Sequence, residues 1–362
     1  MQAGGATVLF ICRELEGYLC DLITAQGFRV VRLPGPVIGY EGKTAHPHAS
    51  WLGTTWQEDA EQTRSIIEAL DVRPDWLVVD HYALDYRWEQ TMHPSVGRIL
   101  VIDDLADRPH DCDLLLDQNL VAEMGSRYAD KVPADCGLLL SPKYALLQPG
   151  YAVLHDRTPA REGKIKRILI YFGGVDSDNL TGRALNAFMD LSRPEIEVDV
   201  VIAKSNPHAK LIQEQVVRQA NIYLHADLPT LSPLMAQADL AIGAGGTTHW
   251  ERLCLGLPTL VVTVAENQRP VTANLHREGL VDWIGHKDEI NKQTIRKALE
   301  RTIDSRSLVD WSSNCLAVCD GRGTSRVVDI LATAPLDKST DDGNVAPSVV
   351  TSPPQHALNL LS

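Results

Sequence analysis

The sequence lacks an excess of basic residues. Its 362 residues include 34 Lys and Arg against 47 Asp and Glu, which gives a formal net charge of −13 at pH 7. This charge repels nucleic acids and anionic membranes, so neither is expected as a partner. A phosphorylated ligand would therefore be held locally, by backbone amides and helix N-termini.

The cysteines form no recognisable framework. The seven are scattered, no CxxC occurs, and only Cys315 and Cys319 lie close together in the chain. We therefore expect reduced, mostly buried thiols, with no disulfide framework, no metal and no cofactor.

Long apolar runs and several enzyme motifs are missing as well. No run approaches the ~18–20 residues of a membrane span, and the N-terminus shows no basic region followed by an apolar stretch. The expected location is the cytoplasm. The absence of GxSxG, HExxH, a P-loop and GxGxxG removes support for serine hydrolases, zincins, P-loop kinases and Rossmann dehydrogenases.

Short runs rich in β-branched residues alternate with longer segments of helical pattern along the sequence. This alternation is typical of parallel α/β domains. Near-continuous apolar runs, such as those before Asp80 and Asp103, suit strands buried on both faces. The expected strands are 6–12, 28–33, 76–80, 99–103 and 114–116 in the first half, and 166–172, 197–203, 221–224, 240–243 and 259–264 in the second.

The proline and glycine residues between these runs predict two domains. Pro149, Gly150, Pro159 and Gly163 mark residues 149–163 as a linker between domains at 1–148 and 164–333. Residues 334–362, rich in Pro, Ser, Thr, Asp and Gly, are expected to form a disordered tail. Two doubly wound parallel-sheet domains would place a ligand cleft between them.

The strongest motif is IGAGGTTHWE at 242–251, a glycine-rich turn between a predicted strand and a predicted helix. Glycines such as Gly245 and Gly246 let the backbone approach phosphate oxygens, and Thr247 or Thr248 lies near the helix start. Glu251, about one helical turn further on, could bind vicinal hydroxyls such as those of a ribose. The alternative is a tight turn with an exposed Glu.

A second glycine-rich turn, YFGGVDSDNL at 171–180, follows the first strand of the second half. It offers the amides of Gly173 and Gly174, with Asp176 or Ser177 as a helix cap. Because both turns follow strands of one domain, they could face a single diphosphate. Taken alone, this turn could equally be an ordinary capped connection.

The strand at 259–264 ends in polar residues that could reach the same ligand. Glu266, Asn267 and Gln268 are candidates for sugar hydroxyls, with a solvated loop as the alternative.

In the first half, two predicted strands also end in polar residues. DHYALD at 80–85 and DDLADRPH at 103–110 supply His, Tyr and carboxylates for proton transfer or water positioning. Asp103 and Asp104 could instead cap helices, and Arg108 could pair with either. A divalent metal at these carboxylates is not predicted.

At these motifs the chain resembles a known family. VDHYALDYRWE (79–89), VIDDLADRPHDCDLLLDQN (101–119), SPKYALLQPGY (141–151), IYFGGVDSDNLTGRAL (170–185) and AIGAGGTTHWERLCLGLPTLVVTVAENQ (241–268) are similar to UDP-2,4-diacetamido-2,4,6-trideoxy-β-L-altropyranose hydrolase. That family acts in pseudaminic acid biosynthesis and is related in fold to the glycosyltransferase that makes lipid II.

The resemblance implies a GT-B type α/β fold with two Rossmann-like domains, and release of UDP by water attack at the anomeric carbon with inversion. It places UDP on Gly173, Gly174, Gly246, Thr247 and Thr248, with Glu251 on the ribose. Asn267, Gln268 and Tyr82 would lie near the sugar and the attacking water, with Tyr82 and Asn267 in catalytic roles.

The resemblance also has a gap. The family opens with a strand and a GxGHxxR loop whose His is the general base, and no such loop occurs in this sequence. Residues 1–12 are interpreted as the end of the following helix and the second strand, so the first βα unit of the N-terminal domain is expected to be missing.

Three functions follow from these observations. The first is a UDP-sugar hydrolase acting as a monomer, and the second is a glycosyltransferase using the same UDP site. The third is a nucleotide-sugar-binding protein without catalysis. His81 is a weak candidate to replace the absent base.

Overall fold

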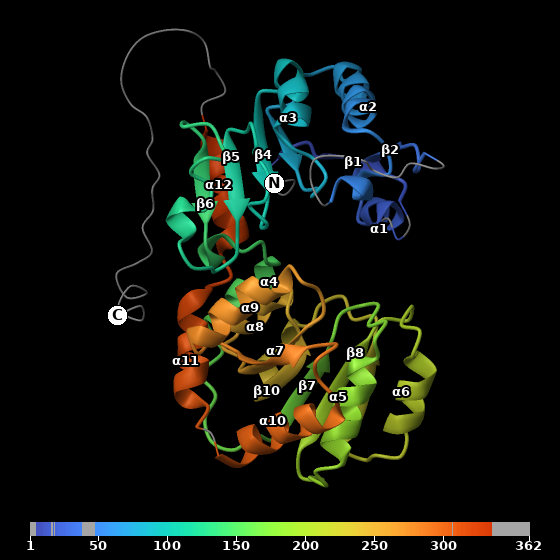
Figure 1. The fold of residues 1–362 in the computed structure, drawn as a ribbon, viewed down its shortest axis with the longest axis vertical. Coiled ribbons are helices and arrows are strands. Elements are labelled where there is room, and N and C mark those ends of the chain that lie inside the picture. Colours follow the sequence, from blue (N-terminus) through green and yellow to red (C-terminus); the bar gives the residue numbers. More distant parts are fainter. Residues whose placement is uncertain (1–4, 16, 18, 38–47, 306, 335–362) are drawn as a thin grey trace. The chain divides into compact units, whose positions relative to one another are not determined.

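The computed structural model describes residues 5–15, 17, 19–37, 48–305 and 307–334. The chain divides into two compact units, which are drawn in Figure 1. Of the described residues, those up to 118 together with 123–140 and 325–334 form the first unit, and 119–122 together with those between 141 and 324 form the second. The expected tail at 334–362 falls outside the described residues except for Ala334.

The second unit contains a six-stranded parallel sheet in the order β12-β11-β10-β7-β8-β9. Its strands are β7 (Arg167–Tyr171), β8 (Glu197–Ile202), β9 (Ile222–Ala226), β10 (Leu240–Ala244), β11 (Thr259–Thr263) and β12 (Asp282–His286). Strands β7, β10 and β11 are almost completely buried, as their near-continuous apolar runs predict.

Helices cover this sheet and complete one large apolar core. They are α4 (Pro149–His155), α5 (Leu180–Met189), α6 (Ala209–Val216), α7 (Ser232–Gln237), α8 (Thr248–Cys254), α9 (Gln268–Arg277), α10 (Lys292–Ser305) and α11 (Val309–Val318), with a 3-10 turn at Pro142–Tyr144. Segment 149–163 was expected as a linker, but it carries α4. Tyr151 and Arg161 in this segment are buried within the second unit.

The first unit contains two parallel ladders, which the described residues do not join by hydrogen bonds. One pairs β1 (Leu9–Arg13) with β2 (Arg29–Leu33), and the other has the order β3 (Trp76–Val79), β4 (Arg98–Ile102), β5 (Leu114–Asp117), β6 (Gly137–Leu140). Strand β3 is an edge of its ladder, and Val78 in this strand is 44% exposed.

Helices and a small core hold the two ladders in one unit. The helices are α1 (Cys20–Ala25), α2 (Trp56–Glu68), α3 (Tyr86–Met92) and α12 (Gly323–Thr333), with 3-10 turns at Ala49–Leu52, His93–Ser95 and Met124–Ser126. Ile11 of β1 packs against the core that contains Val79 and Val101. The Trp76 indole nitrogen donates to Leu331 O at 3.0 Å, which ties α12 to β3.

Candidate functional site

The first glycine-rich turn connects β10 to α8 in the second unit. Gly245 is buried, and a Cβ there would lie 2.7 Å from Thr272 Oγ1, so no larger residue fits without movement. Gly246 is more open. His249 N donates to Gly246 O at the start of the helix, and the amides just before it have no partner within the helix. Thr247 occupies the N-cap position without a side-chain capping bond, and Thr248 begins the helix.

The second glycine-rich turn leaves the neighbouring strand. β7 and β10 are paired in parallel, with Tyr171 opposite Gly243, so both turns begin at the same sheet edge. Gly173 has φ of +94°, which L side chains rarely adopt, and no atom lies within 4 Å of the position of a Cβ. The expectation that the two turns can serve one ligand is therefore compatible with the geometry of this unit.

Asp176 has a structural task in the same turn. Its carboxylate accepts hydrogen bonds from Leu180 N at 2.8 Å and Thr181 N at 2.9 Å. Asn179 is the N-cap residue of α5 and accepts from Gly182 N at 3.1 Å. The carboxylate of Asp176 is thus engaged by the start of α5, as a helix cap would be.

Glu251 lies half-buried on α8, about one turn after the glycines. Burial raises the pKa of this carboxyl, and a hydrogen bond with Tyr151 opposes that shift. Its neighbour Arg252 is buried and donates to Ala244 O at 2.7 Å, which holds the beginning of the turn against the helix. Desolvation lowers the pKa of Arg252 to about 10.

Gln268 joins the third polar segment to the first turn. Its Oε1 accepts from Val264 N at 2.8 Å, and its Nε2 lies 3.7 Å from where a Cβ on Gly246 would stand. Asn267 is exposed at the N-cap of α9, and Glu266 is exposed and bonded to Arg269 at 3.1 Å. Of these three candidates, only Gln268 is seen to meet the glycine-rich turn.

In the first unit, Tyr82 lies just beyond the carboxyl end of β3. Its hydroxyl donates to Asp104 Oδ1 at 2.8 Å, and Asp104 follows the neighbouring strand β4. Burial and the Asp104 carboxylate raise the pKa of Tyr82, so the phenol stays protonated at neutral pH. The Asp80 carboxyl reaches solvent, yet partial desolvation and Asp104 raise its pKa as well.

His81 is arranged as a hydrogen-bond donor. Ala83 N donates to His81 Nδ1 at 3.0 Å, so the proton of the neutral ring lies on Nε2. Burial lowers the pKa of His81 and keeps the ring neutral. The other ring nitrogen, Nε2, therefore carries a proton, which is the wrong state for a general base.

Other polar residues in and near the DHYALD and DDLADRPH motifs are buried and form hydrogen bonds or ion pairs with one another. Arg108 donates to Asp103 Oδ1 at 2.8 Å, and Glu89 Oε1 lies 2.7 Å from His110 Nδ1. Arg108 therefore pairs with Asp103, and it also donates to Asp107 Oδ1 at 2.9 Å. With exposed fractions of 0–4%, the side chains of the Arg108–Asp103 and His110–Glu89 pairs hold the 103–113 loop and do not present groups to a ligand.

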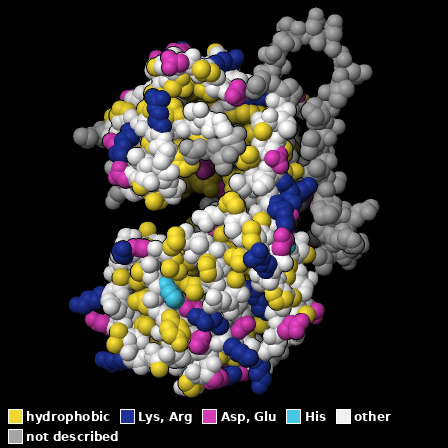
Figure 2. Space-filling model, turned by 180° about the vertical axis from the view of Figure 1, so that it is seen from behind, with side chains coloured by type: hydrophobic (Ala, Val, Ile, Leu, Met, Phe, Trp, Pro, Cys, Tyr) yellow, Lys and Arg dark blue, Asp and Glu magenta, His cyan; other side chains and the backbone are white. Residues whose placement is uncertain are grey.

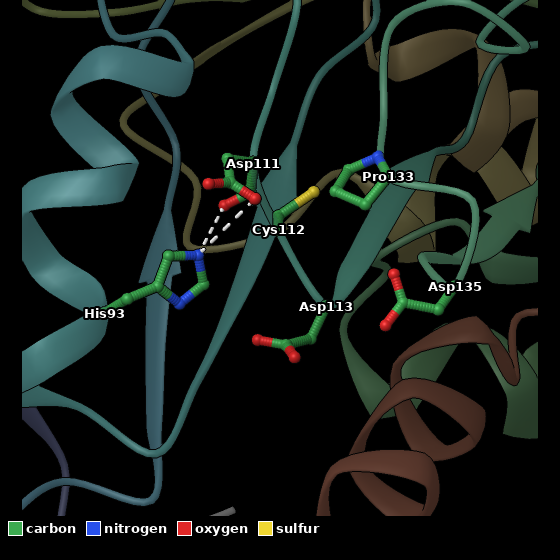
Figure 3. A pocket seen from close by; sticks show the side chains of 6 residues that line it. All are labelled: His93, Asp111, Cys112, Asp113, Pro133 and Asp135. Carbon is green, nitrogen blue, oxygen red and sulfur yellow. Dashed lines mark hydrogen bonds and ion pairs between the residues drawn. The ribbon is translucent and has the colours of Figure 1, made fainter. Parts of the chain in front are cut away.

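A pocket of about 250 Å³ lies at the amino edge of the β3-β4-β5-β6 sheet, opposite the edge where Tyr82 and Asp104 lie (Figure 3). His93, Asp111, Cys112, Asp113, Pro133 and Asp135 line it. Asp113 immediately precedes β5, and its carboxylate accepts from Ile99 N near the start of β4. Three carboxylates repel a diphosphate, so this amino-edge pocket is unsuited to the expected ligand.

Sequence reasoning missed an aromatic cluster beside Tyr82. The rings of His48 and Trp51 lie 5.7 Å and 5.9 Å from the Tyr82 ring, and 4.7 Å from each other. Trp51 lies in a segment without strand or helix periodicity, so only the presence of two nearby tryptophans, Trp51 and Trp56, distinguished it in the sequence.

The parts of the chain that the structure describes contain no group of three or more His, Cys, Asp or Glu suited to a metal ion. They also contain no helix that is both long and apolar enough to cross a membrane.

Comparison with solved structures defines the fold class. MurG from Acinetobacter baumannii superposes with a TM-score of 0.62 at 12% identity, covering 91% of this chain and 92% of MurG. The UDP complex of S. aureus MnaA gives 0.56 at 13% identity, covering 92% of this chain and all of MnaA. The protein thus has the GT-B type fold, with two Rossmann-like α/β units, as expected.

Among proteins of known sequence, the chain resembles the UDP-2,4-diacetamido-2,4,6-trideoxy-β-L-altropyranose hydrolase of Campylobacter jejuni. The two are 28% identical over 276 residues, 75% of this chain and 86% of the hydrolase. The chain is also 26% identical to the spore coat polysaccharide biosynthesis protein SpsG of Bacillus subtilis over 195 residues, 52% of this chain and only 56% of SpsG. No protein-family profile matches the chain.

Proposed function

We propose that this protein binds a UDP-linked 2,4-diacetamido-2,4,6-trideoxy sugar and hydrolyses it to UDP and the free sugar. The observation that carries the proposal is the pair of glycine-rich turns on the adjacent strands β7 and β10, with Gln268 Nε2 beside Gly246. The resemblance to the Campylobacter hydrolase, which extends over both units, supports the choice of sugar.

UDP is assigned to the second unit. The amides around Gly173, Gly174 and Gly246 donate to the diphosphate, and the start of α8 adds the positive end of its dipole. Gly245 N already donates to Val262 O at 3.1 Å, so Gly245 is assigned the close approach of the backbone to the phosphate and not a hydrogen bond. Thr247 and Thr248 add hydroxyl donors. In this assignment the Glu251 carboxylate accepts from the ribose hydroxyls.

This mode of binding suits the charge of the molecule. On the face of the second unit drawn in Figure 2, basic and acidic side chains are interspersed. Directional backbone donors can hold an anion on such a surface without a field of positive charge.

The sugar is assigned to polar side chains of the AENQ (265–268) and DHYALD (80–85) motifs. Gln268 and Asn267 contact sugar hydroxyl or amide groups, with Glu266 at the exposed end of the same segment. Tyr82, which already donates to Asp104, orients the sugar or the attacking water. Water attacks the anomeric carbon and gives up one proton to a general base or to solvent. The bond from that carbon to the diphosphate oxygen breaks, UDP leaves with that oxygen, and the configuration at the anomeric carbon is inverted. We place the reaction in the cytoplasm and the protein as a monomer.

A nucleotide-sugar-binding protein without turnover is the second candidate. It is favoured by His81, whose Nε2 carries a proton and cannot accept one from water. The choice between the two candidates depends on whether another group accepts that proton.

One experiment separates these functions. The chain is incubated with the UDP-linked diacetamido sugar, with no acceptor present, and released UDP is measured by a coupled assay. We expect release of UDP and of the free sugar. UDP release only after addition of an acceptor would instead identify a glycosyltransferase. Calorimetry with UDP provides the remaining distinction, because binding without release identifies the binding protein and absence of binding contradicts the UDP assignment itself.

A further inference from the structure

The aromatic cluster of the first unit, defined as His48, Trp51 and Tyr82, includes an unusually exposed tryptophan. Trp51 is 53% exposed, although its ring touches both other members of the cluster. A large apolar side chain that is partly held and partly open to solvent is typical of a surface that contacts a ligand.

The backbone beneath Trp51 is well anchored. Ala49 and Leu52 of the same 3-10 turn are 5% and 4% exposed, and Trp51 N donates to His48 O at 3.0 Å. Gly53 ends the turn with φ of +71°, where a Cβ would come within 3.1 Å of Pro36 and Leu15. The indole is therefore presented from a fixed position.

Polar groups fix the other two members of the cluster. The Tyr82 hydroxyl donates to Asp104, and His48 Nε2 lies 3.8 Å from Asp107 Oδ2. The cluster thus combines an exposed indole with a phenol and a carboxylate, and both Tyr82 and Asp104 lie just beyond the carboxyl ends of parallel strands. Ligands of open α/β sheets bind outside these ends.

We propose that Trp51 is a specificity-determining residue that packs against the apolar substituents of the sugar. This inference rests on the proposed function. A 2,4-diacetamido-2,4,6-trideoxy sugar carries two acetamido methyl groups and a C6 methyl group, where common hexoses carry hydroxyls. An indole face gains from contact with methyl groups and leaves hydroxyls without a partner, so Trp51 favours N-acetylated deoxy sugars over UDP-glucose.

The test compares Trp51→Ala with the wild type and with Trp51→Phe, which keeps an aromatic ring. We expect Trp51→Ala to raise KM for the diacetamido substrate by about tenfold, the order associated with losing a few methyl contacts. The Kd of UDP and the value of kcat should change much less, and Trp51→Phe should recover most of the KM. Val72→Ala, which truncates a 75% exposed residue of the same unit, is the control for loss of exposed apolar surface.

A second measurement does not require turnover. Saturation-transfer NMR with UDP-N-acetylglucosamine compares the acetyl methyl signal with the uracil signals, and Trp51→Ala should lower that ratio while Val72→Ala should not. If the wild type releases no UDP, the proposed hydrolysis fails, but this ratio still decides the role of Trp51. An unchanged KM and an unchanged ratio in Trp51→Ala would overturn the inference. A loss of UDP affinity in that variant would also overturn it, because Trp51 would then have a structural role.

Discussion

At Glu251, burial changes the pKa of the carboxyl that is proposed to bind the ribose. Burial raises the pKa of its carboxyl above the ordinary value of 4.5, so protonation begins at a higher pH than for an exposed Glu. The proposed ribose contact needs the ionised form, because a carboxylate accepts hydrogen bonds from two hydroxyls. Affinity should therefore be complete near neutral pH and decline as the pH falls through the raised pKa.

This pH dependence is best measured with UDP-N-acetylglucosamine, because its diphosphate diester does not titrate in the relevant range. Glu251→Gln should weaken binding roughly tenfold at neutral pH, as expected for loss of hydrogen bonds to a charged group. It should also remove the decline in affinity at acid pH. Glu300→Gln, on the exposed face of α10, is the matched control. An acid decline that persists in Glu251→Gln would show that another group is responsible.

His81 and Tyr82 show the limit of motif reasoning at single residues. Both lie in the DHYALD motif, but the sequence does not reveal that Ala83 N occupies His81 Nδ1 or that Tyr82 bonds to Asp104. These contacts depend on a local loop and on a neighbouring strand, and they decide which group can donate a proton and which can accept one.

At the scale of elements, α2 connects β1 to α3. Arg13 at the end of β1 donates to Asp59 Oδ2 at 2.7 Å, and the Trp88 indole donates to Asp59 Oδ1 at 2.9 Å. The side chains of Arg13 and Asp59 are only 5% and 6% exposed. This buried link is important because the described ladders of the first unit share no hydrogen bonds with each other.

Asp59→Ala should therefore destabilise the first unit by about 3–5 kcal/mol, because it removes the carboxylate that balances the buried Arg13 charge and leaves only the neutral acceptors Gln62 and Pro34 O. Hydrogen-exchange mass spectrometry should show faster exchange in residues 9–13 and 56–92. Glu61→Ala on the same helix removes an exposed pair with Arg64 and should change stability by no more than about 0.5 kcal/mol. Equal effects of the two substitutions would contradict the anchoring role of Asp59.

Strands β6 and β12 were not predicted from the sequence, and each has a physical reason. Strand β6 is the short GLLL segment, and β12 contains a glycine, Gly285, with φ of +131° beside an irregular pairing with β11. Each forms an edge of its sheet. Its extended conformation therefore depends more on pairing with one neighbouring strand that is distant in the chain than on the strand propensity of its own residues. The central strands, with their near-continuous apolar runs, were predicted close to their observed bounds.

For the whole molecule, the net charge of −13 bears on how an anionic ligand is held. If backbone amides bind UDP, added salt has little attraction between basic side chains and phosphate to screen. Added salt also weakens the repulsion between the acidic protein and the anionic ligand. Raising NaCl from about 50 mM to about 500 mM should therefore change the Kd of UDP by less than about threefold. A tenfold or larger weakening, measured by calorimetry, would indicate that Lys or Arg side chains hold the diphosphate.

By itself, the sequence determined the alternation of strands and helices, the two glycine-rich turns and the family resemblance, because these depend on local spacing and residue type. Tertiary structure decided that the turns leave adjacent strands, that segment 149–163 packs as part of the second unit, and that Trp51 lies beside Tyr82. It also placed α12 in the first unit, where Leu331 O meets Trp76. Each of these outcomes joins residues that are far apart in the chain, and such contacts depend on how buried surfaces fit together.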